Sequence, residues 1–74
     1  MGRLKELRIS RGYTQLKMQM LTGIDQSDYS KLESEKRRYT FEQCRKIAIA
    51  LDTSMYYLAG LTDVKEPYQR KKPN

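Results

Sequence analysis

The chain has 74 residues, enough to build one hydrophobic core but not two. Hydrophobic residues make up 38% and charged residues 32%, which is typical of a small folded domain and excludes a disordered chain. Fifteen Lys and Arg against nine Asp and Glu give a net charge of +6, which favours an anionic partner.

The residue types exclude several classes of function. With no histidine and a single cysteine, the chain lacks a His/Cys metal set, a disulfide framework and a histidine acid or base, so we expect no enzyme, metal or cofactor. No apolar run approaches the roughly 18 residues of a membrane span, and the start of the chain lacks the apolar centre of a signal peptide. We expect a cytoplasmic protein without a membrane partner.

The first helix is predicted over about residues 3–11. Leu4 and Leu7 recur at helical spacing, and Gly12 supplies the left-handed residue that ends many helices.

Two further short helices follow, joined by a tight turn. Thr14 can cap a helix over residues 15–21 because its hydroxyl accepts from the free peptide N–H groups of a first turn. Gly23 breaks that pattern, and Asp25 can cap a third helix over residues 26–33.

The last two helices are predicted from their caps. Thr40 and Gln43 form a Thr-x-x-Gln capping box before a helix over residues 41–51. Ser54 can cap a final turn or two over residues 55–59.

The predicted fold class is all-α, a compact five-helix domain over residues 1–62. Residues 63–74 contain both prolines and almost no apolar side chains, and we expect a flexible basic tail there. The predicted core consists of apolar side chains on inward helix faces: Leu4, Leu7, Met18, Ile24, Tyr29, Leu32, Phe41, Cys44, Ile47, Ala48, Leu51 and Leu58. Cys44 lies in this apolar pattern, which favours a buried structural cysteine over a redox sensor.

Residues 14–33 resemble the helix-turn-helix of phage repressor and Cro proteins, an XRE-like family. The resemblance includes the Leu-Arg and Arg-Gly pairs of the first helix and covers about residues 3–61. It implies a repressor-like fold with a helix-turn-helix at the second and third helices. The sequence departs from the family at Gln19, where a small Ala is usual, at the apolar Met20 and Leu21, and at Asp52, where Gly is expected.

The resemblance implies that the third helix reads bases in the major groove of DNA. By helical period, Tyr29 points inward, and the opposite side of the helix faces out. Gln can pair with adenine and Lys with guanine. The alternative is an ordinary solvated polar face. The candidate base-reading residues are Gln26, Ser27, Ser30 and Lys31.

Phosphate contacts are expected on both flanks of this helix. A helix N-terminus offers free N–H groups to an anion, and consecutive cations attract the backbone through charge. The alternatives are a solvated loop and, for Tyr39, packing. Asp28 has two interpretations, acceptor for cytosine N4 or helix cap, of which we favour the cap. The candidate phosphate-binding residues are Thr14, Gln15, Lys36, Arg37, Arg38 and Tyr39.

The resemblance also implies a partly buried ion pair between Arg8 and Glu33. A dimer interface is expected in the last helix, where family members often make their two-fold contact. The alternative is that one tyrosine covers the core and the other is solvated. The candidate interface residues are Tyr56, Tyr57, Leu58 and Leu61.

These observations predict a regulator of transcription that binds double-stranded DNA in a sequence-specific manner. We expect a repressor that acts as a homodimer on a palindromic operator. The alternative is a protein-interaction module with a protein partner, such as the antitoxin of a toxin–antitoxin pair.

Overall fold

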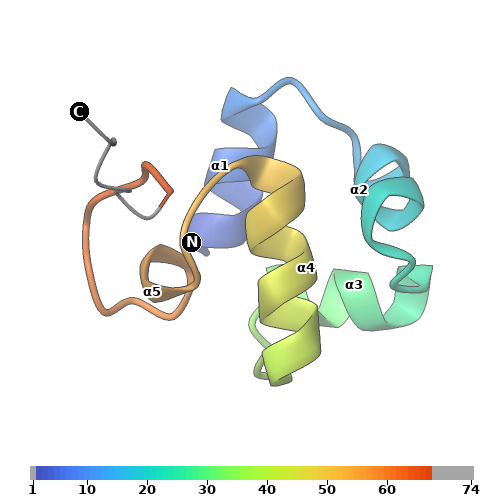
Figure 1. Ribbon diagram of the computed structural model, residues 1–74. Helices are drawn as coiled ribbons and strands as arrows, with labels where there is room; N and C mark the ends of the chain where they lie inside the picture. The colour runs from blue at the N-terminus through green and yellow to red at the C-terminus, as the bar shows by residue number, and fades with distance from the viewer. Residues whose placement is uncertain (1, 68–74) are drawn as a thin grey trace.

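The structure is a computed structural model that describes residues 2–67, and these residues contain five α-helices and no strand. Among them, every helix is too short or too polar to cross a bilayer. In Figure 1, α4 lies at the centre, with α2 and α3 on one side and α5 on the other. The prediction of an all-α, five-helix fold is confirmed. The helices are α1 (Arg3–Ser10), α2 (Gln15–Thr22), α3 (Gln26–Glu33), α4 (Phe41–Leu51) and α5 (Met55–Leu58).

Side-chain caps fix where four of the helices begin. Thr40 and Gln43 form the predicted capping box, in which each side chain accepts the other residue's backbone N–H at 3.0 Å. Each cap satisfies a peptide donor that would otherwise have no partner in the first turn. The N-cap residues of α2, α3, α4 and α5 are Thr14, Asp25, Thr40 and Ser54.

Left-handed residues end the helices, and two of them are not glycine. Gly12 and Gly60 follow α1 and α5 with φ of +78° and +81°, while Glu35 and Asp52 follow α3 and α4 with φ of +62° and +54°. After Glu35, the Lys36 N–H donates to a carbonyl of the preceding helix at 2.9 Å, and corresponding bonds follow the other three residues. This pattern closes the last turn and reverses the chain sharply.

The core lies between α4 and the other helices. Two predictions about it were wrong. Phe41 is 71% exposed. It stands on the first turn of α4, beyond the helices that cover the other apolar side chains on the same face of α4. Tyr57 is 5% exposed and belongs to the core. The buried apolar side chains are Leu4, Leu7, Met18, Ile24, Tyr29, Leu32, Cys44, Ile47, Ala48, Leu51, Tyr57 and Leu58.

Arg3 fastens the segment after α5 to the domain. Its guanidinium donates to the carbonyls of Tyr57 and Thr62 and to Asp63, and lies 4.6 Å from the centre of the Tyr57 ring. The Thr53 hydroxyl also donates to a carbonyl of this segment, at 2.5 Å. The chain is therefore attached to the fold as far as residue 65, and residues 68–74 of the predicted tail lie outside the described residues.

Candidate nucleic-acid interface

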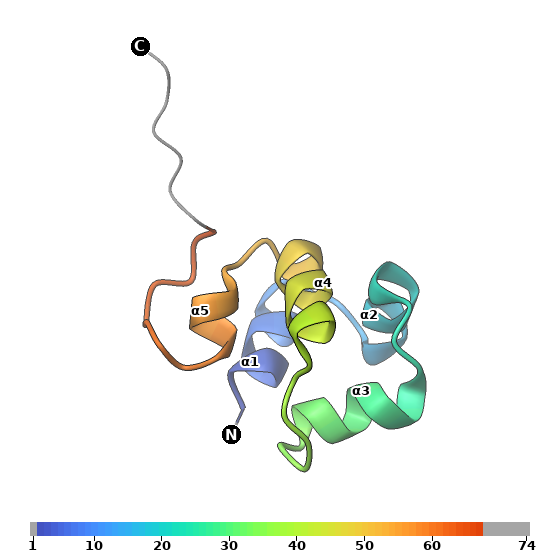
Figure 2. The ribbon, with the colours of Figure 1, turned by 60° about the horizontal axis from the view of Figure 1, so that its bottom comes forward.

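The turn between α2 and α3 is held by a buried hydroxyl and a glycine. The Thr22 hydroxyl donates to the Met18 carbonyl at 2.7 Å and accepts from the Ile24 N–H at 3.2 Å. Gly23 adopts φ of +74°, a conformation that glycine takes without steric cost. The turn therefore has a fixed shape and sets how α3 leaves α2 (Figure 2).

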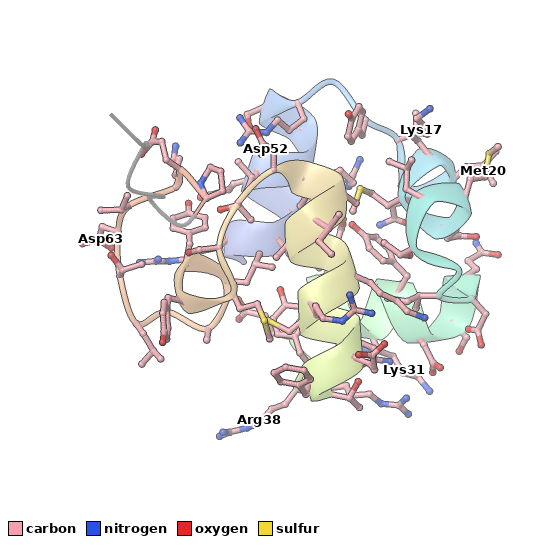
Figure 3. The ribbon with its side chains drawn as sticks, viewed as in Figure 1. Lys17, Met20, Lys31, Arg38, Asp52 and Asp63 are labelled. Atoms are coloured by element: carbon pink, nitrogen blue, oxygen red, sulfur yellow. The ribbon has the colours of Figure 1, made fainter. Side chains whose placement is uncertain are left out.

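The outer side of α3 carries four polar side chains that are exposed, and we call them the reading face: Gln26, Ser27, Ser30 and Lys31. Within residues 2–67, none of these side chains makes a hydrogen bond or ion pair. Their donors and acceptors are therefore available to an external partner. Figure 3 shows Lys31 projecting from the lower edge of the molecule.

The inner side of α3 ends in a buried group of charges, which we call the Glu33 cluster. Glu33 accepts from Arg8 at 2.5 Å, from Gln15 at 2.9 Å and from the Tyr29 hydroxyl at 2.7 Å. Arg8 also donates to the carbonyl of Tyr13 at 2.8 Å. The cluster therefore joins α1, the first turn of α2 and the last turn of α3 at one carboxylate.

The electrostatics of the cluster follow from its hydrogen bonds. Burial raises the pKa of Glu33, but the bonds from Arg8, Tyr29 and Gln15 outweigh it and hold the pKa below its ordinary value. The pKa of Tyr29 is raised, first by burial and then by its bond to Glu33. The cluster thus holds a carboxylate anion, a guanidinium cation and a neutral phenol.

The predicted phosphate-binding residues of α2 lie at its N-terminus. The Thr14 hydroxyl accepts the Lys17 N–H at 3.0 Å, which satisfies one donor of the first turn. Gln15 was predicted to bind phosphate, but its side-chain amide nitrogen donates to Glu33. Within residues 2–67 the Gln15 amide oxygen makes no hydrogen bond, and the first peptide N–H groups of α2 have no partner inside the helix.

Three exposed cations, Lys36, Arg37 and Arg38, follow α3, and we call them the basic loop. They are not equivalent. The Arg37 Nη1 atom donates to Asp28 Oδ1 at 2.8 Å, whereas Lys36 and Arg38 have no carboxylate partner within residues 2–67. Figure 3 shows Arg38 projecting from the lower edge of the molecule, as Lys31 does.

The Arg37 bond shows how the Asp28 side chain is used. The Asp28 N–H donates to the cap residue Asp25 at 2.9 Å, but its carboxylate bonds to Arg37 and not to the backbone of Asp25. The preferred interpretation of Asp28 as the second side chain of a capping pair was therefore wrong. Two opposite charges nine residues apart are too common in sequences to have indicated this pair.

Tyr39 packs against the core, which was the alternative interpretation of this residue. The ring is half-buried against the core, and burial raises the pKa of the hydroxyl.

Cys44 is buried as well, and burial raises the pKa of its thiol, as expected of a structural cysteine. No group of side chains suited to a metal ion occurs within residues 2–67.

The predicted dimer surface is only partly available. Tyr57 and Leu58 are buried in the core of the single chain, which agrees with the alternative that one tyrosine covers the core. The reason is helical geometry, because successive side chains stand about 100° apart, so Tyr57 and Leu58 share the side that covers the core and Tyr56 lies on the other side. Tyr56 and Leu61 are 56% and 72% exposed.

Comparison with known proteins agrees with this geometry. A family model described as a helix-turn-helix domain matches residues 2–64, which include all five helices. No curated protein and no solved structure matches the chain. Helix-turn-helix domains are characteristic of regulators that bind DNA. The protein therefore belongs to the helix-turn-helix domain family, of the XRE-like kind that its resemblance to phage repressor and Cro proteins predicts.

Proposed function

We propose that this protein is a sequence-specific regulator that inserts α3 into the major groove of double-stranded DNA. It acts as a repressor by occupying an operator. The observation that carries the proposal is the contrast across α3, where exposed polar side chains without partners stand on a helix that the Glu33 cluster holds from behind. A rigid helix can present such side chains to base edges at low entropic cost.

Each residue has a role that follows from its chemistry. Gln26 can pair with adenine N6 and N7, and Lys31 can donate to guanine O6 and N7. Ser27 and Ser30 accept or donate and tolerate several bases. The start of α2 and the basic loop bind phosphates on the two flanks of the groove and set the register of α3.

The protein binds its operator as a dimer, and the two-fold symmetry of the dimer requires a palindromic DNA sequence. The exposed Tyr56 and Leu61 side chains, with Val64 at 58% exposure, supply apolar surface near the end of the domain. A two-fold dimer places two copies of α3 roughly 34 Å apart, one helical turn of DNA. The operator should therefore contain inverted half-sites at that spacing.

Selection from a random duplex pool at about 150 mM salt tests the proposal. We expect the selected duplex to contain an inverted repeat and to bind far more tightly than a scrambled duplex of the same composition. Gln26→Ala combined with Lys31→Ala should abolish that preference. Lys5→Ala, which removes an exposed cation from α1, is the matched control and should retain it. Equal, weak and salt-sensitive binding to both duplexes would overturn the proposal.

A protein-interaction module, such as an antitoxin, is the second candidate. The outer side of α2 favours it, because Leu16 and Met20 stand one turn apart there with 65% and 74% exposure. The same experiment separates the two candidates. A module of this kind would show no selected duplex, and a protein partner would bind the Gln26→Ala, Lys31→Ala variant as well as it binds the wild type.

A further inference from the structure

The ion pair between Arg37 and Asp28 connects the basic loop to α3. After Glu35 in the left-handed conformation, Lys36 donates to the Lys31 carbonyl at 2.9 Å, so the chain folds back along α3. Arg37 then reaches the first turn of the helix, and its Nη1 atom lies 2.8 Å from Asp28 Oδ1. One side chain of the basic loop is thereby tied to the helix that carries the reading face.

The position of Asp28 places this pair beside the reading face. At about 100° per residue, Asp28 stands between Lys31, about 60° away around the helix, and the buried Leu32, about 40° away, so it borders the reading face on its Lys31 side. The side chains of Asp28 and Arg37 are 35% and 45% exposed, so both reach solvent. A pair this exposed adds little to stability.

The guanidinium keeps donors for a second partner. Only its Nη1 atom bonds to another group within residues 2–67, so Nη2 and Nε remain available. Arginine presents its donors in a fixed planar fork, so an anchor at one nitrogen orients the others. A lysine at this position would gain no such orientation. Lys36 and Arg38 have no carboxylate that orients them, within the same part of the chain.

We propose that Asp28 is a positioning residue, which holds Arg37 at the edge of the reading face so that its free donors bind a phosphate of the strand that flanks the bases read by α3. This inference rests on the proposed function. Arg37 then supplies a directed phosphate contact, whereas Lys36 and Arg38 supply charge without fixed geometry.

The proposal predicts the opposite of what net charge predicts. Asp28→Asn removes a negative charge from a protein that binds a polyanion, so charge alone predicts tighter binding to every duplex. If Asp28 positions Arg37, Asp28→Asn instead weakens binding to the selected duplex, by roughly tenfold. Binding to the scrambled duplex should stay equal or become slightly tighter. Asp28→Glu keeps a carboxylate within reach of Arg37 and should recover most of the lost affinity.

A double-mutant cycle completes the test. Arg37→Gln should also weaken binding to the selected duplex roughly tenfold and lower the salt slope by about one. Asp28→Asn in the Arg37→Gln background should cost no further affinity, because there is no guanidinium left to position. Glu42→Gln removes the carboxylate of another surface pair, Glu42 with Arg45 on α4, and is the matched control that should not weaken binding.

The outcomes separate this inference from the proposed function. If the wild type shows no preference for a selected duplex, the proposed function fails, and with it the basis of the inference. If the wild type is specific but Asp28→Asn binds the selected duplex as tightly or more tightly, only the positioning role fails. Equal losses from Asp28→Asn in both backgrounds would also overturn that role. Circular dichroism and melting curves check that each variant is folded.

Discussion

The two sides of α3 use polar groups in opposite ways. On the inner side, Glu33 is 7% exposed and receives hydrogen bonds from three different side chains. On the outer side, the reading face is exposed, and its side chains bond to no other residue of the described chain. One short helix therefore carries both a buried charge whose hydrogen bonds are made within the chain and a row of exposed polar groups without a partner in the described chain.

This difference separates stability from recognition. A buried charge must be paired, so its partners cannot be changed without loss of the fold. Replacing an exposed polar side chain changes the stability of the protein little, so the identity of such residues can be determined by what a partner requires. The inner side fixes where α3 lies, and the outer side is free to determine what it binds.

The largest expected effect comes from breaking the inner side. Glu33→Ala leaves Arg8, whose side chain is 11% exposed, without its carboxylate and should lower the free energy of unfolding by about 3 kcal/mol. Chemical denaturation followed by circular dichroism measures it. Glu42→Ala, which breaks the exposed pair with Arg45, is the control and should leave the midpoint nearly unchanged. An unchanged midpoint for Glu33→Ala would show that the cluster does not hold the helices together.

The pH dependence of stability should report the same cluster. Because the pKa of Glu33 is lower in the folded state than its ordinary value of 4.5, the cluster stabilises the fold fully above that value. This stabilisation is lost as the pH falls through the lowered pKa. Melting temperatures measured from pH 7 downward should therefore drop more steeply for the wild type than for Glu33→Gln. Parallel curves would contradict the prediction.

A smaller effect is expected where the chain leaves α3. Glu35 is held at φ of +62°, which strains a residue with a side chain, so Glu35→Gly should raise stability by about 1 kcal/mol or less. Gly12→Ala is the converse test at φ of +78° and should lower stability. Melting temperatures measure both. A loss of stability in Glu35→Gly would mean that contacts of the Glu35 side chain outweigh the strain.

The smallest effect on stability is expected on the outer side. Ser27→Ala and Ser30→Ala should change the free energy of unfolding by no more than about 0.5 kcal/mol, because both side chains are exposed and unbonded within the described chain. Chemical denaturation measures this, and the same variants should change the affinity for a selected duplex. A large loss of stability would show that the reading face is part of the fold.

Much of the fold could be predicted because its signals are local. A cap acts within one turn, so Thr40 and Gln43 were sufficient to locate the start of α4. The predictions failed where packing decides. Phe41 and Tyr57 both fit an apolar helical pattern, and only the arrangement of the neighbouring helices determines that one is exposed and the other buried.

The candidate site was predictable to a similar extent. The four residues of the reading face follow from helical period once the family is identified, although their contacts with DNA remain a prediction. The bonds of Gln15 to Glu33 and of Arg37 to Asp28 could not be predicted. Both depend on where long side chains end, which requires the positions of separate elements.

The sequence by itself determined the helices, their caps and the helix-turn-helix family, because each of these depends on residues within a few turns of one another. The family resemblance implied the pairing of Arg8 with Glu33, which are 25 residues apart. Only the tertiary structure decided that Arg37 pairs with Asp28, nine residues away, and that Gln15 bonds to Glu33. Whether two charged atoms meet depends on how the chain is folded between them, and the sequence pattern does not contain that distance.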